Sequence, residues 1–120
     1  MNDFKNLKVW EKAHALALGI YTVTKKFPKQ EEYGITSQLR RAVVSIPTNI
    51  AEGSGKMTQK DFAHFLQIAL GSCQEVEYLV FLSHDLGYTD ESLNKGLALQ
   101  IGEVKAMLIG LIKKVRSNKN

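Results

Sequence analysis

Four long segments of this chain repeat apolar residues at intervals of three and four positions, the period of an α-helix that buries one face. The pattern predicts four helices, over residues 7–27, 35–52, 58–87 and 89–116. The connections between these segments are short, and short connections between long helices make neighbouring helices run antiparallel. The chain is therefore expected to have an all-α fold, an antiparallel up-down four-helix bundle.

The ends of the segments carry residues typical of turns and helix caps. Pro28 disfavours the helical conformation for the residue before it, which sets the end of the first helix at Phe27. The segment Gly53–Gly55 is expected to end the second helix, because glycine readily adopts the left-handed conformation found at helix C-termini. Thr58 begins a capping-box pattern for the third helix, and Thr89 is the expected cap of the fourth.

Length and composition favour one domain covering residues 1–120. At 120 residues and 13.4 kDa, two domains with separate cores would each be near the lower size limit for folding alone. The longest run without a charged residue lies between Asp61 and Glu75 and is too short to cross a bilayer. The first twelve residues lack the apolar stretch of a secretory signal. We therefore expect a cytoplasmic protein with no membrane association.

Charge is distributed unevenly along the chain. Residues 1–60 carry ten Lys and Arg against five Asp and Glu, residues 61–104 one against seven, and residues 105–120 five against none. Such asymmetry is compatible with a basic surface that attracts phosphate, and equally with basic and acidic surfaces of neighbouring subunits that meet. If the ligand is RNA or DNA, bound without sequence preference, the predicted contacts are five basic residues that the core does not require: Lys8, Lys12, Arg40, Lys56 and Lys60.

The second helix carries a narrow polar stripe beside its apolar face: Gln38, Arg41, Ser45, Asn49 and Glu52. We favour a structural role for this stripe, as a polar network that fixes helix register or a subunit interface, with Arg41 and Glu52 compensating each other's charge. The alternative is a ligand-binding or catalytic surface. Pro47 lies within the same helix, removes one backbone hydrogen bond and predicts a local bend, where Ser45 or Asn49 could satisfy the freed carbonyl.

The third helix has more apolar residues than one buried stripe needs: Phe62, Phe65, Ile68, Leu79, Phe81, Leu82 and Leu86. Some of them are expected to meet another subunit. Gly71, in the middle of this helix, costs about 1 kcal/mol of helix stability relative to alanine. The usual reason for such a glycine is a close crossing with another helix, which we predict at this point.

Residue patterns for catalysis or metal binding are missing from the sequence. The three histidines form no pair three or four positions apart, and the single Cys73 builds neither a disulfide nor a cysteine-based zinc site. No glycine-rich segment follows a strand, as a phosphate-binding loop requires. We therefore expect no catalytic residue, no metal and no cofactor, although an enzyme that uses Arg41, Asn49 and Glu52 is a minor alternative.

Several segments together resemble the four-helix-bundle proteins encoded in intervening sequences of bacterial 23S rRNA genes. They are Phe4-x-x-Leu7-x-Val9-Trp10, Phe27-Pro28-x-x-Glu31-x-Tyr33-Gly34, residues 38–53, Gly71-Ser72-x-x-Glu75-x-Glu77 and Leu86-Gly87-Tyr88. The similarity covers nearly the whole chain. Thr48 departs from it, since a small residue such as alanine is expected at that position.

The resemblance implies a homopentameric ring of four-helix bundles. It also implies kinship with the accessory proteins of diversity-generating retroelements, which are basic pentamers that bind nucleic acid and associate with a reverse transcriptase. No defined biochemical function follows for the rRNA-encoded branch, and an analogy of fold does not establish one. The leading hypothesis is a non-enzymatic oligomer that binds RNA or DNA, and the alternative is a protein-protein interaction or scaffold module with no nucleic-acid ligand.

Overall fold

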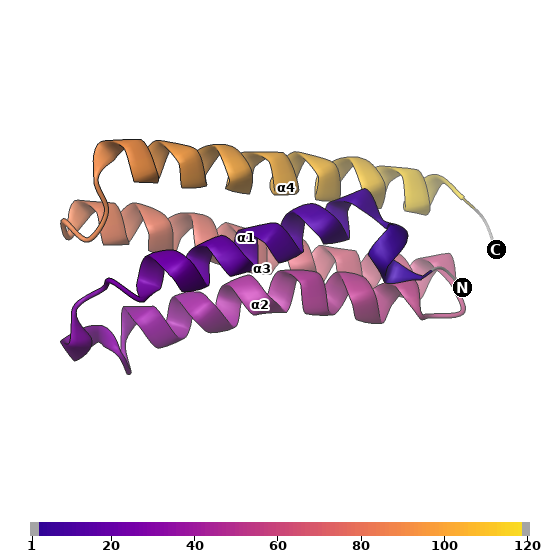
Figure 1. The fold of residues 1–120 in the computed structure, drawn as a ribbon. Coiled ribbons are helices and arrows are strands. Elements are labelled where there is room, and N and C mark those ends of the chain that lie inside the picture. Colours follow the sequence, from indigo (N-terminus) through magenta and orange to yellow (C-terminus); the bar gives the residue numbers. More distant parts are fainter. Residues whose placement is uncertain (1–2, 119–120) are drawn as a thin grey trace.

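The computed structural model of the chain describes residues 3–118 and contains four antiparallel α-helices (Figure 1). They are α1 Lys8–Thr24, α2 Ile35–Ser54, α3 Gln59–Asp85 and α4 Glu91–Ser117. Two short 3₁₀ turns, η1 Phe4–Asn6 and η2 Lys29–Glu31, precede α1 and α2. The described residues contain no strand, which confirms the predicted all-α fold of four helices.

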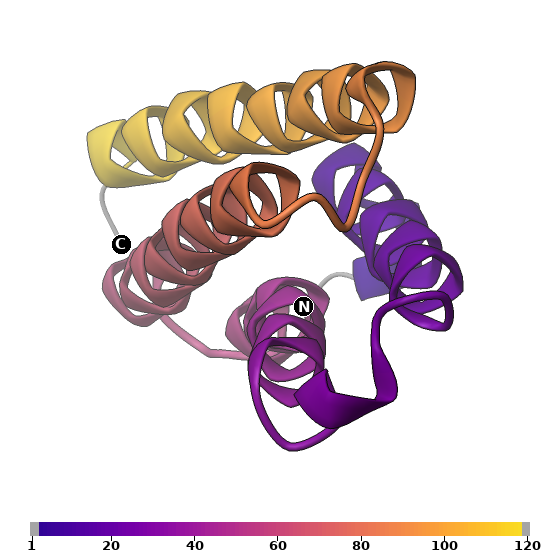
Figure 2. The same ribbon diagram turned by 90° about the vertical axis from the view of Figure 1, so that its left-hand side faces the viewer.

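Each helix packs on its neighbours in the sequence, and α1 also packs on α4, which closes the bundle (Figure 2). The core takes large aliphatic side chains from all four helices, such as Leu16, Ile46, Leu66 and Leu108, all fully buried. Burying one such side chain contributes about 1.5–3 kcal/mol. The apolar period of the sequence is therefore what assembles the bundle.

The second connection differs from the prediction. Gly53 does not end α2 in a left-handed conformation, because both it and Ser54 belong to the helix. A β-carbon at residue 53 would lie 2.7 Å from Phe65 Cβ and 3.1 Å from Phe62 Cδ1. Gly53 is thus needed for the close approach of α2 to α3, and Gly55 follows it in a right-handed conformation.

The left-handed conformation occurs instead after α3. Gly87, with φ +84°, is the only residue of the described chain with a positive φ angle. Its backbone N–H donates to the carbonyl of His84, and that of Tyr88 donates to the carbonyl of Ser83, both at 2.9 Å. This hydrogen-bond pair satisfies the last carbonyls of α3 and turns the chain back toward α4.

Two helix N-termini test the predicted caps. Thr58 Oγ1 accepts a hydrogen bond from the Asp61 N–H at 3.1 Å, which confirms the cap of α3. The predicted cap of α4 is wrong by one residue, because Asp90 Oδ1 accepts from the Leu93 N–H at 2.8 Å. Thr89 is buried instead, with its carbonyl 3.0 Å from the His84 Nδ1.

The first helix ends three residues earlier than predicted. It ends at Thr24, whose hydroxyl donates to the carbonyl of Ile20 at 2.7 Å. The following residues form a tighter turn, in which the Phe27 N–H donates to the Thr24 carbonyl at 3.1 Å.

No helix among the described residues is both long enough and apolar enough to span a bilayer.

Candidate nucleic-acid interface

The antiparallel arrangement brings four helix ends together at one end of the bundle (Figure 1). These are the start of α1, the end of α2, the start of α3 and the end of α4. Exposed basic side chains come from each of these regions, and we call this set the basic end: Lys8, Lys56, Lys60, Lys114 and Arg116. Lys119 also contributes to the positive charge of residues 105–120 but lies outside the described residues.

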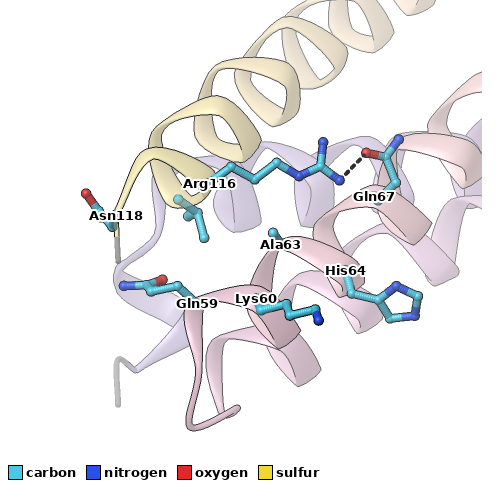
Figure 3. A pocket seen from close by; sticks show the side chains of 8 residues that line it. Gln59, Lys60, Ala63, His64, Gln67, Arg116 and Asn118 are labelled. Carbon is cyan, nitrogen blue, oxygen red and sulfur yellow. Dashed lines mark hydrogen bonds between the residues drawn. The ribbon is translucent and has the colours of Figure 1, made fainter. Parts of the chain in front are cut away.

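The α3 and α4 helices form a polar hollow of about 420 Å³ at the basic end. Lys60 and His64, one turn apart on α3, line it together with Arg116 from α4 (Figure 3). The Arg116 guanidinium reaches across to α3 and donates a hydrogen bond to Gln67 Oε1 at 3.2 Å. The hollow therefore presents cationic and hydrogen-bonding side chains on an exposed surface, the kind of groups that contact phosphate oxygens.

A second hollow of about 350 Å³ adjoins the first, with Gln59, Val115 and Asn118 lining both. Lys56 from the α2–α3 turn and Lys114 from α4 line this second hollow. Residues 56 and 114 are far apart in sequence, so only the bundle brings their charges together. The two hollows give the basic end a continuous surface that crosses from the α2–α3 turn to α4.

Sequence reasoning missed Lys114 and Arg116 as binding candidates. Both lie in the last turn of α4, where basic side chains are favourable at the end of any helix and do not by themselves indicate a binding site. The signal that identifies them is the antiparallel topology, which places the end of the fourth helix beside the start of the third. The positive sum of residues 105–120 then adds to that of the α2–α3 turn.

Two of the five predicted contacts lie apart from the basic end. Lys12 Nζ forms an ion pair with Glu103 Oε2 at 3.4 Å, which links α1 to α4. Arg40 lies toward the opposite end, where its Nε donates to Thr24 Oγ1 at 2.8 Å and its guanidinium lies 4.6 Å from the centre of the Tyr21 ring. These contacts hold the end of α1 against α2, so Arg40 has a structural function in this fold.

The polar stripe of α2 divides into two parts. Ser45 and Asn49 are half-buried: Ser45 Oγ lies 2.8 Å from Ser72 Oγ on α3, and Asn49 Nδ2 donates to the Ser45 carbonyl at 2.8 Å. The helix continues through Pro47, and the Asn49 bond goes to the Ser45 carbonyl and not to the one that Pro47 frees.

The charged members of the stripe, by contrast, are exposed. Arg41 and Glu52 lie about 16 Å apart along the helix. The predicted direct compensation of their charges is therefore wrong. Neither forms an ion pair with any described residue. Gln38 is also exposed. The structural role of the whole stripe stays a prediction.

Cys73 lies in the middle of α3, and its side chain is buried. Burial raises the pKa of its thiol to about 11, with a further increase from Glu77 that Lys105 partly offsets. The thiol is therefore protonated near neutral pH and unsuited to nucleophilic attack. Within residues 3–118, no three His, Cys, Asp or Glu side chains are grouped so that they could hold a metal ion.

Comparison with known proteins places this geometry in context. A family model described as the 23S rRNA-intervening sequence protein matches residues 5–110. A crystal structure from Bacteroides thetaiotaomicron, a protein of unknown function from the S23 ribosomal protein family, is similar with a TM-score of 0.82. The two chains are 28% identical, and the match covers 88% of this chain and 98% of the other. The comparison with curated proteins gives no match.

Proposed function

The chain belongs to the 23S rRNA-intervening sequence protein family, and from that premise we propose that it is a non-enzymatic oligomer that binds RNA or DNA through its basic end. The observation that carries the proposal is the convergence of Lys8, Lys56, Lys60, Lys114 and Arg116 from separate parts of the chain. Lysine acts toward phosphate as a mobile point charge, and arginine adds a planar hydrogen-bonding fork.

The chemistry of the basic end favours contacts to the phosphate backbone over the reading of bases. Its lysines are exposed, and among residues 3–118 no helix or loop projects from it to enter a groove of a duplex. Contacts of this kind supply affinity without sequence choice. The proposed ligand is therefore any RNA or DNA strand, with RNA preferred if the gene lies in an rRNA operon.

Assembly into an oligomer would increase the affinity for nucleic acid, because a single basic end makes only a few phosphate contacts. We propose the homopentameric ring that the family resemblance implies, with the cytoplasm as its location. Several basic ends on one particle would bind the same strand, and each further contact would form at high effective concentration. A single copy would then bind much more weakly than the ring.

Charge reversal with a matched control tests the proposal. The variant Lys56→Glu, Lys60→Glu and Lys114→Glu changes three exposed lysines of the basic end. Its control, Lys25→Glu, Lys26→Glu and Lys29→Glu, changes three exposed lysines at the opposite end and alters net charge equally. The readout is retention of mixed-sequence RNA at about 100 mM salt.

We expect the wild type and the control to retain RNA and the basic-end variant to lose it while remaining helical. Equal loss in both variants would mean that only net charge matters, and no retention by the wild type would refute nucleic-acid binding. Failure of the wild type to retain RNA would leave the protein-interaction module as the function. That alternative is favoured by one further feature, an apolar groove of about 570 Å³ between α1 and α2.

A further inference from the structure

The groove between α1 and α2 is an apolar surface that no part of residues 3–118 covers. It is lined by Trp10, His14 and Leu18 from α1 and by Val44, Pro47 and Thr48 from α2, among others. Leu18 is 58% exposed and Val44 40%. The Trp10 and His14 rings stack with their centres 4.9 Å apart, so one wall of the groove is already ordered. Exposed apolar surface of this kind marks an interaction site.

The outer face of α3 is a second uncovered apolar surface, on the far side of the bundle from α1 (Figure 2). Ile68 and Tyr78 are 41% and 59% exposed on this face, with Gly71 between them. The close helix crossing predicted at Gly71 is wrong within the chain, because a β-carbon built there meets nothing within 4 Å. The face is therefore open for a helix of another molecule.

An arginine on the first surface matches a glutamate on the second in its position along the bundle. On α2, Arg41 lines a hollow with Tyr21 and Val44 at one end of the groove, and Glu52 follows Ala51 at the other. On α3, Glu75 and His64 are separated by the same eleven positions as Arg41 and Glu52. All four side chains are exposed, and Arg41, Glu52 and Glu75 form no ion pair with a described residue.

The Ser45–Ser72 contact fixes the relative height of the two helices. Arg41 lies about one turn from Ser45, and Glu75 about one turn from Ser72, in the same direction along the bundle. Two copies in the same orientation, side by side, therefore bring Arg41 of one to the height of Glu75 of the other. Glu52 and His64 then lie at similar heights where this contact borders the basic end, and the His64 ring N–H can donate a hydrogen bond to the Glu52 carboxylate.

We propose that the α1/α2 groove binds the outer face of α3 of a second copy of this chain, with Gly71 allowing close approach. This inference rests on the self-association in the proposed function and specifies the surfaces that carry it. The two surfaces are different, so each subunit uses one toward each neighbour, and the contact repeats until a ring closes. All basic ends then lie on the same rim of the ring.

Crosslinking between two populations of chains tests this contact. In a Cys73→Ala background, one population carries Thr48→Cys in the groove and the other carries Gly71→Cys on α3. Positions 48 and 71 lie within about 3 Å of the same height, counted from Ser45 and Ser72. Population mixing excludes a bond within one chain, and a tag on one population identifies the mixed dimer.

We expect the mixed dimer on mild oxidation, and little covalent dimer from either population alone. The matched control is Gly102→Cys, an exposed α4 position at a similar height with nothing within 4 Å of its added β-carbon, which is expected not to crosslink to Thr48→Cys. If Gly71→Cys fails to fold, Ile68→Cys on the same face takes its place. A helical oligomer that gives no mixed dimer with either α3 cysteine would overturn the proposal.

Light scattering on the wild type distinguishes a failure of self-association from a failure of this particular contact. An oligomeric mass without the crosslink would leave self-association in place and refute this contact, whereas a monomeric mass would refute both. The variant Leu18→Glu adds an independent readout, since it charges an exposed groove residue that the folded monomer does not need. It should convert the oligomer to monomers with unchanged helix content, and an unchanged mass would contradict the proposal.

Discussion

Substitution of Gly53 by alanine tests the closest helix contact of the bundle. The new β-carbon would lie 2.7 Å from Phe65 Cβ, an atom fixed to the backbone of α3 and unable to swing aside. Overpacking of this kind costs about 1–3 kcal/mol. Alanine recovers up to about 1 kcal/mol of helix propensity relative to glycine. A contact this short to an immobile atom takes the upper part of that range, about 2–3 kcal/mol, so the expected net loss is about 1–2 kcal/mol of unfolding free energy.

Thermal unfolding followed by circular dichroism at one protein concentration measures this loss. At roughly 4 °C per kcal/mol for a domain of this size, Gly53→Ala should lower the Tm by about 4–8 °C. Gly102→Ala is the matched control, because a β-carbon at this helical position meets nothing within 4 Å. It should raise the stability by up to about 1 kcal/mol. Equal or greater stability of Gly53→Ala would refute the argument that close approach requires glycine.

Three further predictions concern polar and titratable groups. Arg40→Ala should lower the unfolding free energy by about 1–2 kcal/mol, through the lost hydrogen bond to Thr24 and the lost ring contact, while RNA retention stays unchanged; loss of retention would return Arg40 to the interface. Ser45→Ala and Ser72→Ala should each cost about 1 kcal/mol, and a double-mutant cycle should show coupling, since the hydroxyls lie 2.8 Å apart. Strictly additive losses would contradict that contact. The pKa of Cys73 is raised on folding from 9.0 to about 11, so its contribution to stability is present below pH 9 and is lost as the pH rises toward 11. Denaturant titrations should show this loss for the wild type relative to Cys73→Ala, and parallel pH profiles would refute it.

The helices were predictable because burial of one face imposes a period that the sequence displays directly. The turns were less so, because a residue type can meet more than one structural demand. Gly53 resembles a helix terminator in the sequence, yet it is needed for its lack of a side chain beside Phe65. Thr89 and Asp90 are both suitable caps, and only the packing of Thr89 against His84 decides between them.

The candidate interface was predictable in part for a related reason. Lys56 and Lys60 are close in the sequence, so their charge was recognised together. Lys114 and Arg116 are more than fifty positions away in the sequence and join them only through the antiparallel topology. In the sequence, Arg40 looks like an exposed basic residue available to phosphate. Its contacts with Thr24 and Tyr21 depend on how α1 and α2 pack, which the sequence does not specify.

The salt dependence of RNA binding tests the central claim most directly, because each phosphate contact adds about 0.7 to the slope of log affinity against log salt for a single strand. The measurement compares the wild type with the Lys56, Lys60 and Lys114 charge-reversal variant and with the Lys25, Lys26 and Lys29 control. If the basic end holds the strand, the slope should fall by about 2 for each basic end that contacts the strand in the first variant and stay unchanged in the control. Identical slopes for all three proteins, or no salt-dependent binding by the wild type, would contradict the claim.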